Sequence, residues 1–302
     1  MRRHFLLPTA AALLLTIVSP AQTGSLEQHL REISQTKNWL ILRDYYSAPR
    51  LRYDSTGTLT GYSASGDWSS EGIVRLNDFH FSHGRLNLQA QRAEAVIDQK
   101  EFRLRLLDAP DGDKRRPVVV EIGIDLGRED SPEKLDAALS KIFLTEQDHL
   151  ADMVPDYWKP CLTAGLLEKG SSCRFSSELR AIPGVLSADP VVSTTSTENP
   201  DLSIASNQFH VGKGVSPPRT KFNREPEFSE PARLIRYQGT VTLGLTVSPE
   251  GLPTNVRILN PLGAGLDAQA VRAVEQWRFD PAEKDGQPVP AQIAVEVDFH
   301  LY

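Results

Sequence analysis

Alternation of apolar and polar residues with a period of two is the feature that most constrains the fold of this chain. The alternation is strong within residues 73–106 and again within residues 240–301. Because successive side chains of a β-strand point to opposite faces of a sheet, this period predicts strands with one buried and one exposed face. Turn signals such as Asp285-Gly286 separate the runs, as expected for antiparallel hairpins.

Residues 131–154 have a helical pattern instead. Ser131 can cap a helix whose first residue is Pro132, and a second short helix is expected to end before Pro155. Residues 22–182 are therefore predicted to form one α+β domain of unknown role, an antiparallel β-meander followed by helices.

Residues 183–213 differ in composition from the segments on either side. They are rich in Ser, Thr and Pro and lack sustained periodicity, which predicts a flexible linker. This linker separates residues 22–182 from a second predicted domain, residues 214–302.

The first residues of the chain have the layout of a secretory signal peptide. Arg2 and Arg3 precede a short apolar run, and small residues precede an expected cleavage site after Ala21. The apolar run, about 14 residues, is shorter than the roughly 20 residues that a membrane-spanning helix needs. We therefore expect residues 1–21 to be removed and the mature chain to be exported. The alternative is an uncleaved membrane anchor.

Cys161 and Cys173 are the two cysteines of the chain. Export implies an oxidising compartment, where a disulfide is the default, and closing a loop of this size contributes about 3 kcal/mol at most. A zinc site would need two further ligands, and the spacing is not that of a redox Cys-x-x-Cys pair. The sequence therefore predicts a structural disulfide.

The distribution of charge and the absence of known catalytic motifs argue against an enzyme and against nucleic-acid binding. The formal net charge is −6, and the basic residues are scattered rather than gathered into a footprint for nucleic acid. His80 and His83 would point to opposite faces of a strand, so they are not expected to share a metal ion. The sequence has no Gly-rich phosphate loop, nucleophile elbow or His-Glu-x-x-His element. We expect no catalytic residue, no metal and no cofactor.

From residue 214 onwards the pattern predicts a compact domain. A short helix is expected to end at Gly239 and to be followed by a hairpin over residues 240–259. Asp267 is expected to be the N-cap of a second helix, and residues 292–301 alternate as a final strand. Together these elements predict a three-stranded antiparallel sheet packed on helices.

Trp277, Arg278 and Phe279 follow the second predicted helix. Trp277 closes the apolar stripe of that helix, and Phe279 enters the sheet. We expect these three residues, together with Gly239, to have structural roles.

Three stretches of the C-terminal region resemble the C-terminal domain of the TonB energy-transducer family. They are PEFSEPARLIRYQGTV, VSPEGLPTNVRIL and AVRAVEQWRFDPAEKDGQPVP, and the last is followed by the alternating final strand. The resemblance covers residues 214–302. It implies a TonB-like fold in the periplasm that binds a TonB-dependent outer-membrane transporter, or a similar periplasmic partner, by pairing an exposed sheet edge with an extended segment.

On this resemblance, the final strand is the expected docking edge, because an unpaired strand offers main-chain hydrogen bonds to a guest. The same edge could pair with a second copy of the chain, so a homodimer is left open. The residues expected to face away from the core and to modulate the contact are Gln292, Ala294, Glu296, Asp298 and His300.

The chain departs from the pattern of a complete energy transducer, which has an uncleaved membrane helix and a long Pro-rich spacer. We therefore favour an exported, non-enzymatic binding protein. A second hypothesis keeps energy transduction, with residues 1–21 as an inner-membrane anchor facing the periplasm. A third takes residues 22–182 as an unrecognised enzymatic or ligand-binding module and the C-terminal domain as its docking element.

Overall fold

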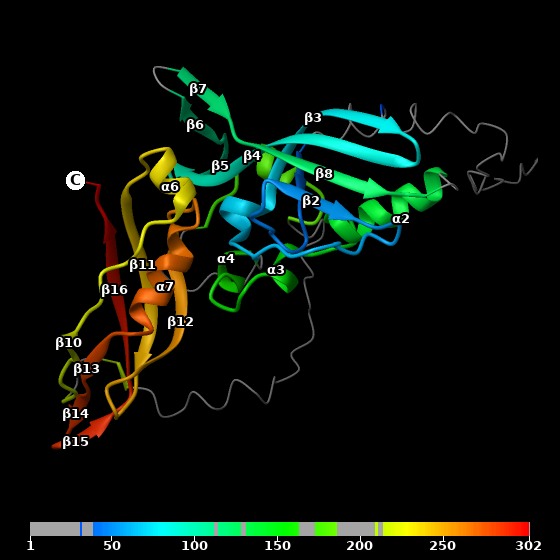
Figure 1. Cartoon of the computed structure of the whole chain (residues 1–302). Coiled ribbons are helices and arrows are strands. Elements are labelled where there is room, and N and C mark those ends of the chain that lie inside the picture. The colour runs from blue at the N-terminus through cyan, green and yellow to red at the C-terminus, as the bar shows by residue number, and fades with distance from the viewer. Residues whose placement is uncertain are drawn as a thin grey trace, which may run out of the picture.

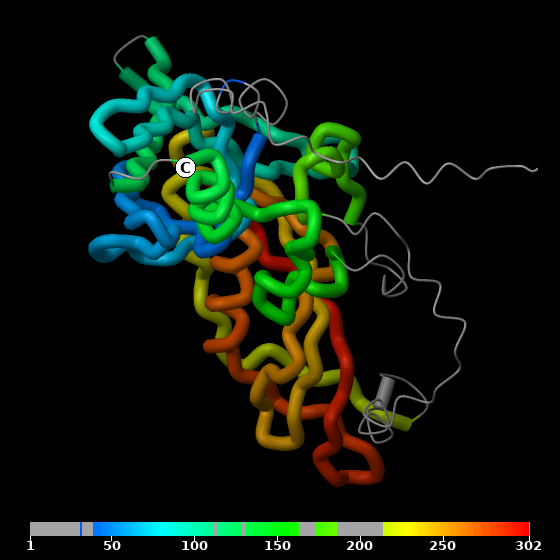
Figure 2. Tube along the Cα trace, turned by 90° about the vertical axis from the view of Figure 1, so that its right-hand side faces the viewer, coloured from blue at the N-terminus to red at the C-terminus, as the bar shows by residue number. Residues whose placement is uncertain are grey.

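The computed structural model describes residues 31, 39–111, 114–127, 131–162, 173–185, 209–210 and 214–301. These residues form two halves that pack against each other: an N-terminal half within residues 39–185 and a C-terminal half within residues 214–301 (Figures 1 and 2). As predicted, the architecture is α+β, with many strands and few helices. The predicted signal peptide and most of the predicted linker lie outside the described residues.

A six-stranded sheet forms the N-terminal half (Figure 1). Its strands run in the order β1-β3-β4-β8-β2, and β5 also pairs with β4. Their bounds are β1 (Trp39–Ile41), β2 (Arg50–Tyr53), β3 (Ile73–Ser82), β4 (Arg85–Asp98), β5 (Glu101–Leu106) and β8 (Val119–Asp125). A small hairpin, β6 (Asp108–Asp111) and β7 (Lys114–Pro117), connects β5 to β8.

The sheet is mixed rather than a purely antiparallel meander, because β2 runs parallel to β8. The remaining strand pairs of the sheet are antiparallel. Alternation in the sequence shows which side chains share a face of a strand, but it does not show which strand lies next to it. The pattern predicted an antiparallel meander and could not show that β2 runs parallel to β8.

β4 is the central strand of this half, with 14 residues. Residues 85–91 pair with β8, and residues 93–98 pair with β5. Residues 90–96 are all buried, which contradicts the prediction of one buried and one exposed face. There η1 (Trp68–Gly72), a π-helical turn, contacts β4, and Ala93, Ala95 and Val96 belong to a core that includes residues of the C-terminal half.

Helices pack beside this sheet in the described part of residues 131–185. They are α2 (Pro132–Ile142), α3 (Leu150–Met153), α4 (Lys159–Leu162) and α5 (Ser177–Arg180). Ser131 caps α2 by accepting a hydrogen bond of 3.3 Å from Lys134 N, with Pro132 at the first position. None of the helices in the described part of the chain is long and apolar enough to cross a membrane.

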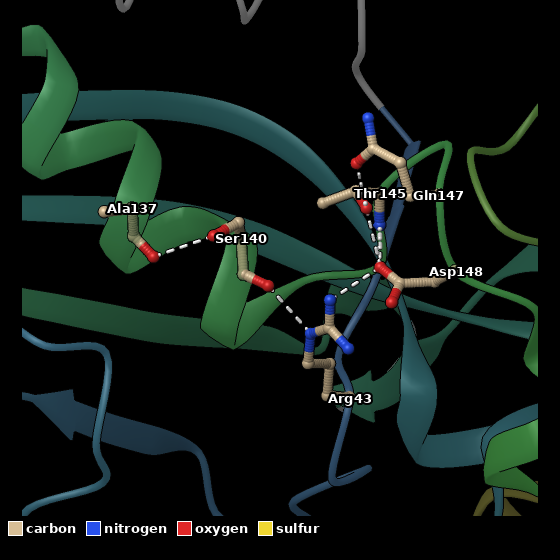
Figure 3. A network of polar contacts seen from close by, with 6 residues as sticks. All are labelled: Arg43, Ala137, Ser140, Thr145, Gln147 and Asp148. Carbon is tan, nitrogen blue, oxygen red and sulfur yellow. Dashed lines mark hydrogen bonds and ion pairs between the residues drawn. The ribbon is translucent and has the colours of Figure 1, made fainter.

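A polar network fixes α2 and the loop before α3 to the segment after β1 (Figure 3). Arg43 donates from Nε to Ser140 O at 2.8 Å and from Nη2 to Asp148 Oδ2 at 2.6 Å. Thr145 donates to the same carboxylate from both N and Oγ1, each at 2.7 Å. Burial alone would raise the pKa of Asp148, but the hydrogen bonds and the Arg43 charge outweigh it and lower that pKa.

The two cysteines form the predicted disulfide. Cys161 lies on α4 and Cys173 lies before α5, with the two Cα atoms 5.2 Å apart. Both residues are buried in the main core. The first residues of the predicted linker also pack against this half: Val185 is buried, and Leu150 N donates to Gly184 O at 2.6 Å.

The C-terminal half is built on a sheet with the order β12-β11-β16-β9 (Figure 1). β11 is antiparallel to both of its neighbours, whereas β9 is a parallel strand of two residues at the start of β16. The elements are β9 (Phe209–His210), β10 (Arg219–Phe222), α6 (Glu230–Leu234), β11 (Gly239–Val247), β12 (Pro253–Asn260), α7 (Leu266–Val274), β13 (Arg278–Asp280), β14 (Ala282–Lys284), β15 (Gln287–Val289) and β16 (Ala291–Phe299).

The two halves share one hydrophobic core. Its buried side chains include Trp68 and Phe102 from the N-terminal half and Leu243 and Leu266 from the C-terminal half. A buried Leu or Phe contributes about 1.5–3 kcal/mol relative to an exposed one. The two halves are therefore held together by a packed hydrophobic interior.

The loop before α7, in the C-terminal half, forms main-chain hydrogen bonds with β4 of the N-terminal half. Ala264 N donates to Ala95 O at 2.9 Å, and Ile97 N donates to Leu262 O at 3.1 Å. The pairing of β3 with β4 stops at Ala93, so residues 262–264 occupy the side of β4 that β3 leaves open.

Candidate strand-docking edge

β16 pairs with β11 in a regular register. Nine consecutive residue pairs run from Gly239↔Phe299 to Val247↔Ala291 without a shift. On the other side of β16, β9 pairs with Ala291 and Gln292 only. Within the described residues, no strand pairs with residues 293–299 on that side. The main-chain donors and acceptors of this segment that point away from β11 therefore have no strand partner among the described residues, and they form the candidate docking edge.

The side chains of β16 alternate as the sequence indicates. Val297 and Phe299 are buried, and Ile293 and Val295 are half-buried on the same face. The residues on the opposite face, and the adjacent His300, are the predicted partner-binding residues. Of these, Gln292 is half-buried, and the exposed ones are Ala294, Glu296, Asp298 and His300.

Polar contacts hold the end of β16 in place. Thr240 Oγ1 donates to Asp298 Oδ1 at 2.5 Å across the β11–β16 pair. Beyond the strand, Leu301 N donates to Gln238 Oε1 at 2.9 Å. The edge is thus presented by a strand that is fixed along its whole length, which reduces the entropy lost when a guest pairs with it.

The residues predicted to be structural lie behind this edge. Trp277 is buried, its Nε1 donates to Arg224 O at 3.0 Å, and its ring centre is 6.2 Å from that of buried Phe279. Arg278, between them, is exposed. Gly239 has φ of 153°, a backbone conformation that residues with a side chain rarely adopt, and a Cβ there would lie 2.8 Å from Leu262 Cδ1.

Asp267 does not cap α7 as the sequence predicts. Gly265, with φ of 73°, is the N-cap, and Asp267 lies in the first turn. Its carboxylate accepts hydrogen bonds from Leu262 N at 2.8 Å and from Gly263 N at 2.6 Å. The carboxylate therefore accepts hydrogen bonds from buried N–H groups of the preceding loop, and it does not cap the N–H groups of α7.

Asp267 belongs to a group of buried acids at the boundary between the halves that the sequence did not indicate. Asp67 accepts hydrogen bonds from Ser69 N at 2.9 Å and from Trp158 Nε1 at 3.2 Å. Burial raises the pKa of Asp67, and it raises that of Asp267 to about 7. Acids such as these look like ordinary surface residues in the sequence, because their burial depends on the packing of distant segments.

Glu94 is the least satisfied member of this group. It is fully buried on β4, and neither carboxylate oxygen has a hydrogen-bond partner among the described residues. Burial raises the pKa of Glu94 to about 8; the Arg105 charge opposes this shift, and the Glu71 charge adds to it. The acids do not form a metal centre: in the part of the chain that the structure describes, no group of His, Cys, Asp and Glu could hold a metal ion.

Residues 224–301, which include β11, β12, α7 and β16, match a family model described as the C-terminal domain of Gram-negative bacterial TonB protein. Curated proteins match as well. "Protein tonB2" of Pseudomonas aeruginosa is 32% identical over 80 residues, which are 26% of this chain and 30% of that protein. "Protein TonB" of Haemophilus ducreyi is 26% identical over 158 residues, 45% of this chain and 55% of that protein. "Protein TonB" of Escherichia coli is 28% identical over 85 residues, 28% of this chain and 35% of that protein.

The matched region is thus only part of each of these relatives. A solved structure, the solution NMR structure of the Pseudomonas aeruginosa TonB CTD, aligns with 32% of this chain and 96% of that chain, at 18% identity and a TM-score of 0.24. The family match and the curated relatives together identify the C-terminal region of this chain, residues 224–301, as a C-terminal domain of the TonB family.

Proposed function

We propose that this chain is a periplasmic, non-enzymatic binding protein that acts in energy-dependent transport. Its C-terminal domain binds an extended segment of an outer-membrane transporter, or of a similar periplasmic partner, by adding that segment as a strand beside β16. The relatives named TonB support the class of function, and their partial coverage leaves the activity of the whole chain as a proposal.

The observation that carries this proposal is the open side of residues 293–299. The strand is regular, its other side is paired along nine residues with β11, and the described part of the chain leaves its outer side without a strand. In strand addition, main-chain hydrogen bonds supply the affinity and alternate side chains supply the selectivity. The exposed side chains of Ala294, Glu296 and Asp298 lie where they would contact every second residue of the guest.

The test is a calorimetric titration of the full chain with peptides from the N-terminal segments of outer-membrane transporters. We expect one such peptide to bind. Two N-methylated versions of that peptide distinguish strand addition from other contacts, because alternate residues of a strand point their N–H groups to opposite sides. Methylation of one alternate set should abolish binding, and methylation of the other set should leave it unchanged.

Two results would contradict the proposal. One is that none of the transporter peptides binds. The other is that both methylated sets bind as well as the parent peptide, since binding would then not use main-chain hydrogen bonds. Light scattering of the free chain tests the homodimer, because two copies paired through β16 would block the edge and lower the apparent affinity as the protein concentration rises.

A further inference from the structure

Besides residues 293–299 of β16, the C-terminal sheet has a second edge, formed by β12 at the other end of the strand order. In Figure 1, β12 lies on the side of the sheet that faces α3 and α4, and β16 lies on the opposite side. An uncovered outer strand pairs readily with any extended chain, including a copy of itself. A domain that binds by strand addition therefore has to specify which of its two edges accepts the guest.

The chain's own backbone covers the β12 edge. Ile258, in the second half of β12, donates its N–H to Tyr157 O at 3.1 Å rather than to β11. Tyr157 lies two residues before α4, and α4 contacts β12. An N–H that a guest strand would need is thus already bonded to the N-terminal half.

The segment that covers β12, residues 157–162, is held in place by buried contacts of Trp158. Trp158, the residue after Tyr157, is fully buried, and its Nε1 donates to Asp67 Oδ2 at 3.2 Å. Its ring centre lies 5.2 Å from that of Trp68 and 5.9 Å from that of Phe102. Aromatic packing of this kind, with a hydrogen bond to a buried carboxyl group, holds the segment in one position.

β12 is also irregular, whereas β16 is not. The β11–β12 register shifts between Thr242 and Leu243 and again between Gly244 and Thr246. Bulges of this kind twist a strand and disrupt a continuous row of main-chain donors and acceptors. Two independent features therefore make β12 a poor site for strand addition.

We propose that the N-terminal half covers the β12 edge and thereby restricts strand addition to β16. The chain then takes one extended partner segment and does not pair with a second copy through β12. The identity of the guest rests on the proposed function above, but the covering of β12 is a property of the free chain.

The first experiment is amide hydrogen exchange on the full chain, with and without a transporter peptide. In the free chain we expect the Ile258 amide to be protected and some β16 amides to exchange fast. Addition of the peptide should slow exchange along β16, leave β12 unchanged and saturate at one peptide per chain. Slowed exchange in β12, or saturation at two peptides, would overturn the inference. A peptide that does not bind at all would contradict the proposed function instead.

The second experiment loosens the cover. Trp158→Ala removes the anchor, and the milder Trp158→Phe removes the N–H donated to Asp67 and shrinks the indole to a single ring while keeping an aromatic side chain in the core. Loss of a hydrogen bond to a carboxylate should speed exchange at Ile258 by about tenfold in the milder variant. With the cover loosened, we expect a second bound peptide or a concentration-dependent dimer. Tyr62→Ala is the control, because that aromatic side chain is 92% exposed.

Each outcome of the second experiment decides the question in folded protein. Faster exchange at the Ile258 amide, together with binding of a second peptide or formation of a dimer, supports the inference. A loosened Ile258 amide with one peptide and no dimer contradicts it, because the cover would then not determine which edge is used. Unchanged protection in both variants also contradicts it, because Trp158 would then not hold the cover in place.

Discussion

The backbone N–H of Gly265 donates a hydrogen bond of 3.1 Å to Ser69 Oγ, although the two residues lie 196 positions apart in the chain. Ser69 Oγ in turn donates to Asp67 Oδ1 at 2.5 Å. This relay connects the loop before α7 to a buried carboxyl group of the N-terminal half. The halves are therefore joined by directional bonds as well as by apolar packing, and the geometry of the loop should be highly sensitive to substitution.

Gly263→Ala is expected to destabilise the chain strongly. Gly263 has φ of 90°, and a Cβ there would lie 2.1 Å from Ala95 O on β4. We expect the free energy of unfolding to fall by about 3 kcal/mol, from backbone strain plus displacement of the loop. Urea denaturation measures it.

Gly214→Ala is the matched control for this prediction. Gly214 has a similar φ of 86°, but among the described residues, its chain neighbours aside, no atom lies within 4 Å of the position of its Cβ. It carries the same strain without the clash, so we expect a loss of about 1 kcal/mol. Equal losses in the two variants would mean that the close approach to β4 contributes nothing.

Stability should decrease as the pH rises from mildly acidic to mildly alkaline values, because of Glu94. The pKa of this group in the folded chain is about 8, raised from 4.5. Between pH 4.5 and about 8, the folded state therefore binds a proton at Glu94 that the unfolded state does not bind. The contribution of Glu94 to stability is complete below the unfolded-state pKa and is lost as the pH rises through the folded-state pKa. Asp267, with a pKa of about 7 and Asp67 nearby, acts in the same direction.

The measurement is the urea midpoint at several pH values for wild type and Glu94→Gln. The amide cannot ionise, so the variant should lose much of the decrease between mildly acidic and mildly alkaline pH and be relatively more stable at the alkaline end. Glu225→Gln, at an exposed position, is expected to keep the wild-type profile. A Glu94→Gln profile that parallels the wild type would show that Glu94 does not titrate in this range.

Two ion pairs of equal length should differ in their contribution to stability. Arg43–Asp148 and Lys159–Asp156 both measure 2.6 Å, but the Asp148 side chain is 16% exposed and the Asp156 side chain 93% exposed. Asp148→Asn should cost about 2 kcal/mol, because it weakens a network that also binds Thr145. Asp156→Asn should cost less than about 0.5 kcal/mol.

The pH dependence of the Asp148 contribution has the opposite sign to that of Glu94. Its pKa is lowered in the folded chain, so its contribution is present above the unfolded pKa and is lost as the pH falls through the folded one. The difference between wild type and Asp148→Asn in thermal unfolding should therefore shrink in strong acid. A constant difference down to strong acid would argue against a charged Asp148.

Glu296→Lys should change partner selection without changing stability. Glu296 is exposed beside the open edge and lies opposite Thr242 of β11. Cross-strand charge pairs are worth up to about 1 kcal/mol, so the affinity for peptides that differ in one charge should shift by about fivefold or less. Glu178→Lys in the N-terminal half is the control, and an equal shift there would indicate a general charge effect.

The sequence was most informative where local signals decide the structure. Ser131 and Pro132 predicted the start of α2, and the alternation from Ile293 to Phe299 matches the two faces of β16. Such features depend on neighbouring residues only, so capping and periodicity are sufficient to identify them.

Long-range packing was beyond the sequence. The parallel direction of β2 and the burial of both faces of β4 depend on segments far away in the chain. Glu94 shows the problem most clearly, because a glutamate in an alternating strand predicts an exposed face, while its side chain is fully buried in a strand whose residues 90–96 are buried on both faces. No pattern within one strand carries that information.

The position of β4 at the boundary between the halves has a consequence for synthesis. Synthesis proceeds from the N-terminus, so β4 exists before residues 262–264, and Ala95 O and Ile97 N cannot form their bonds to the loop until those residues are present. Because the two segments are far apart in the chain, we expect this pairing to form late in folding.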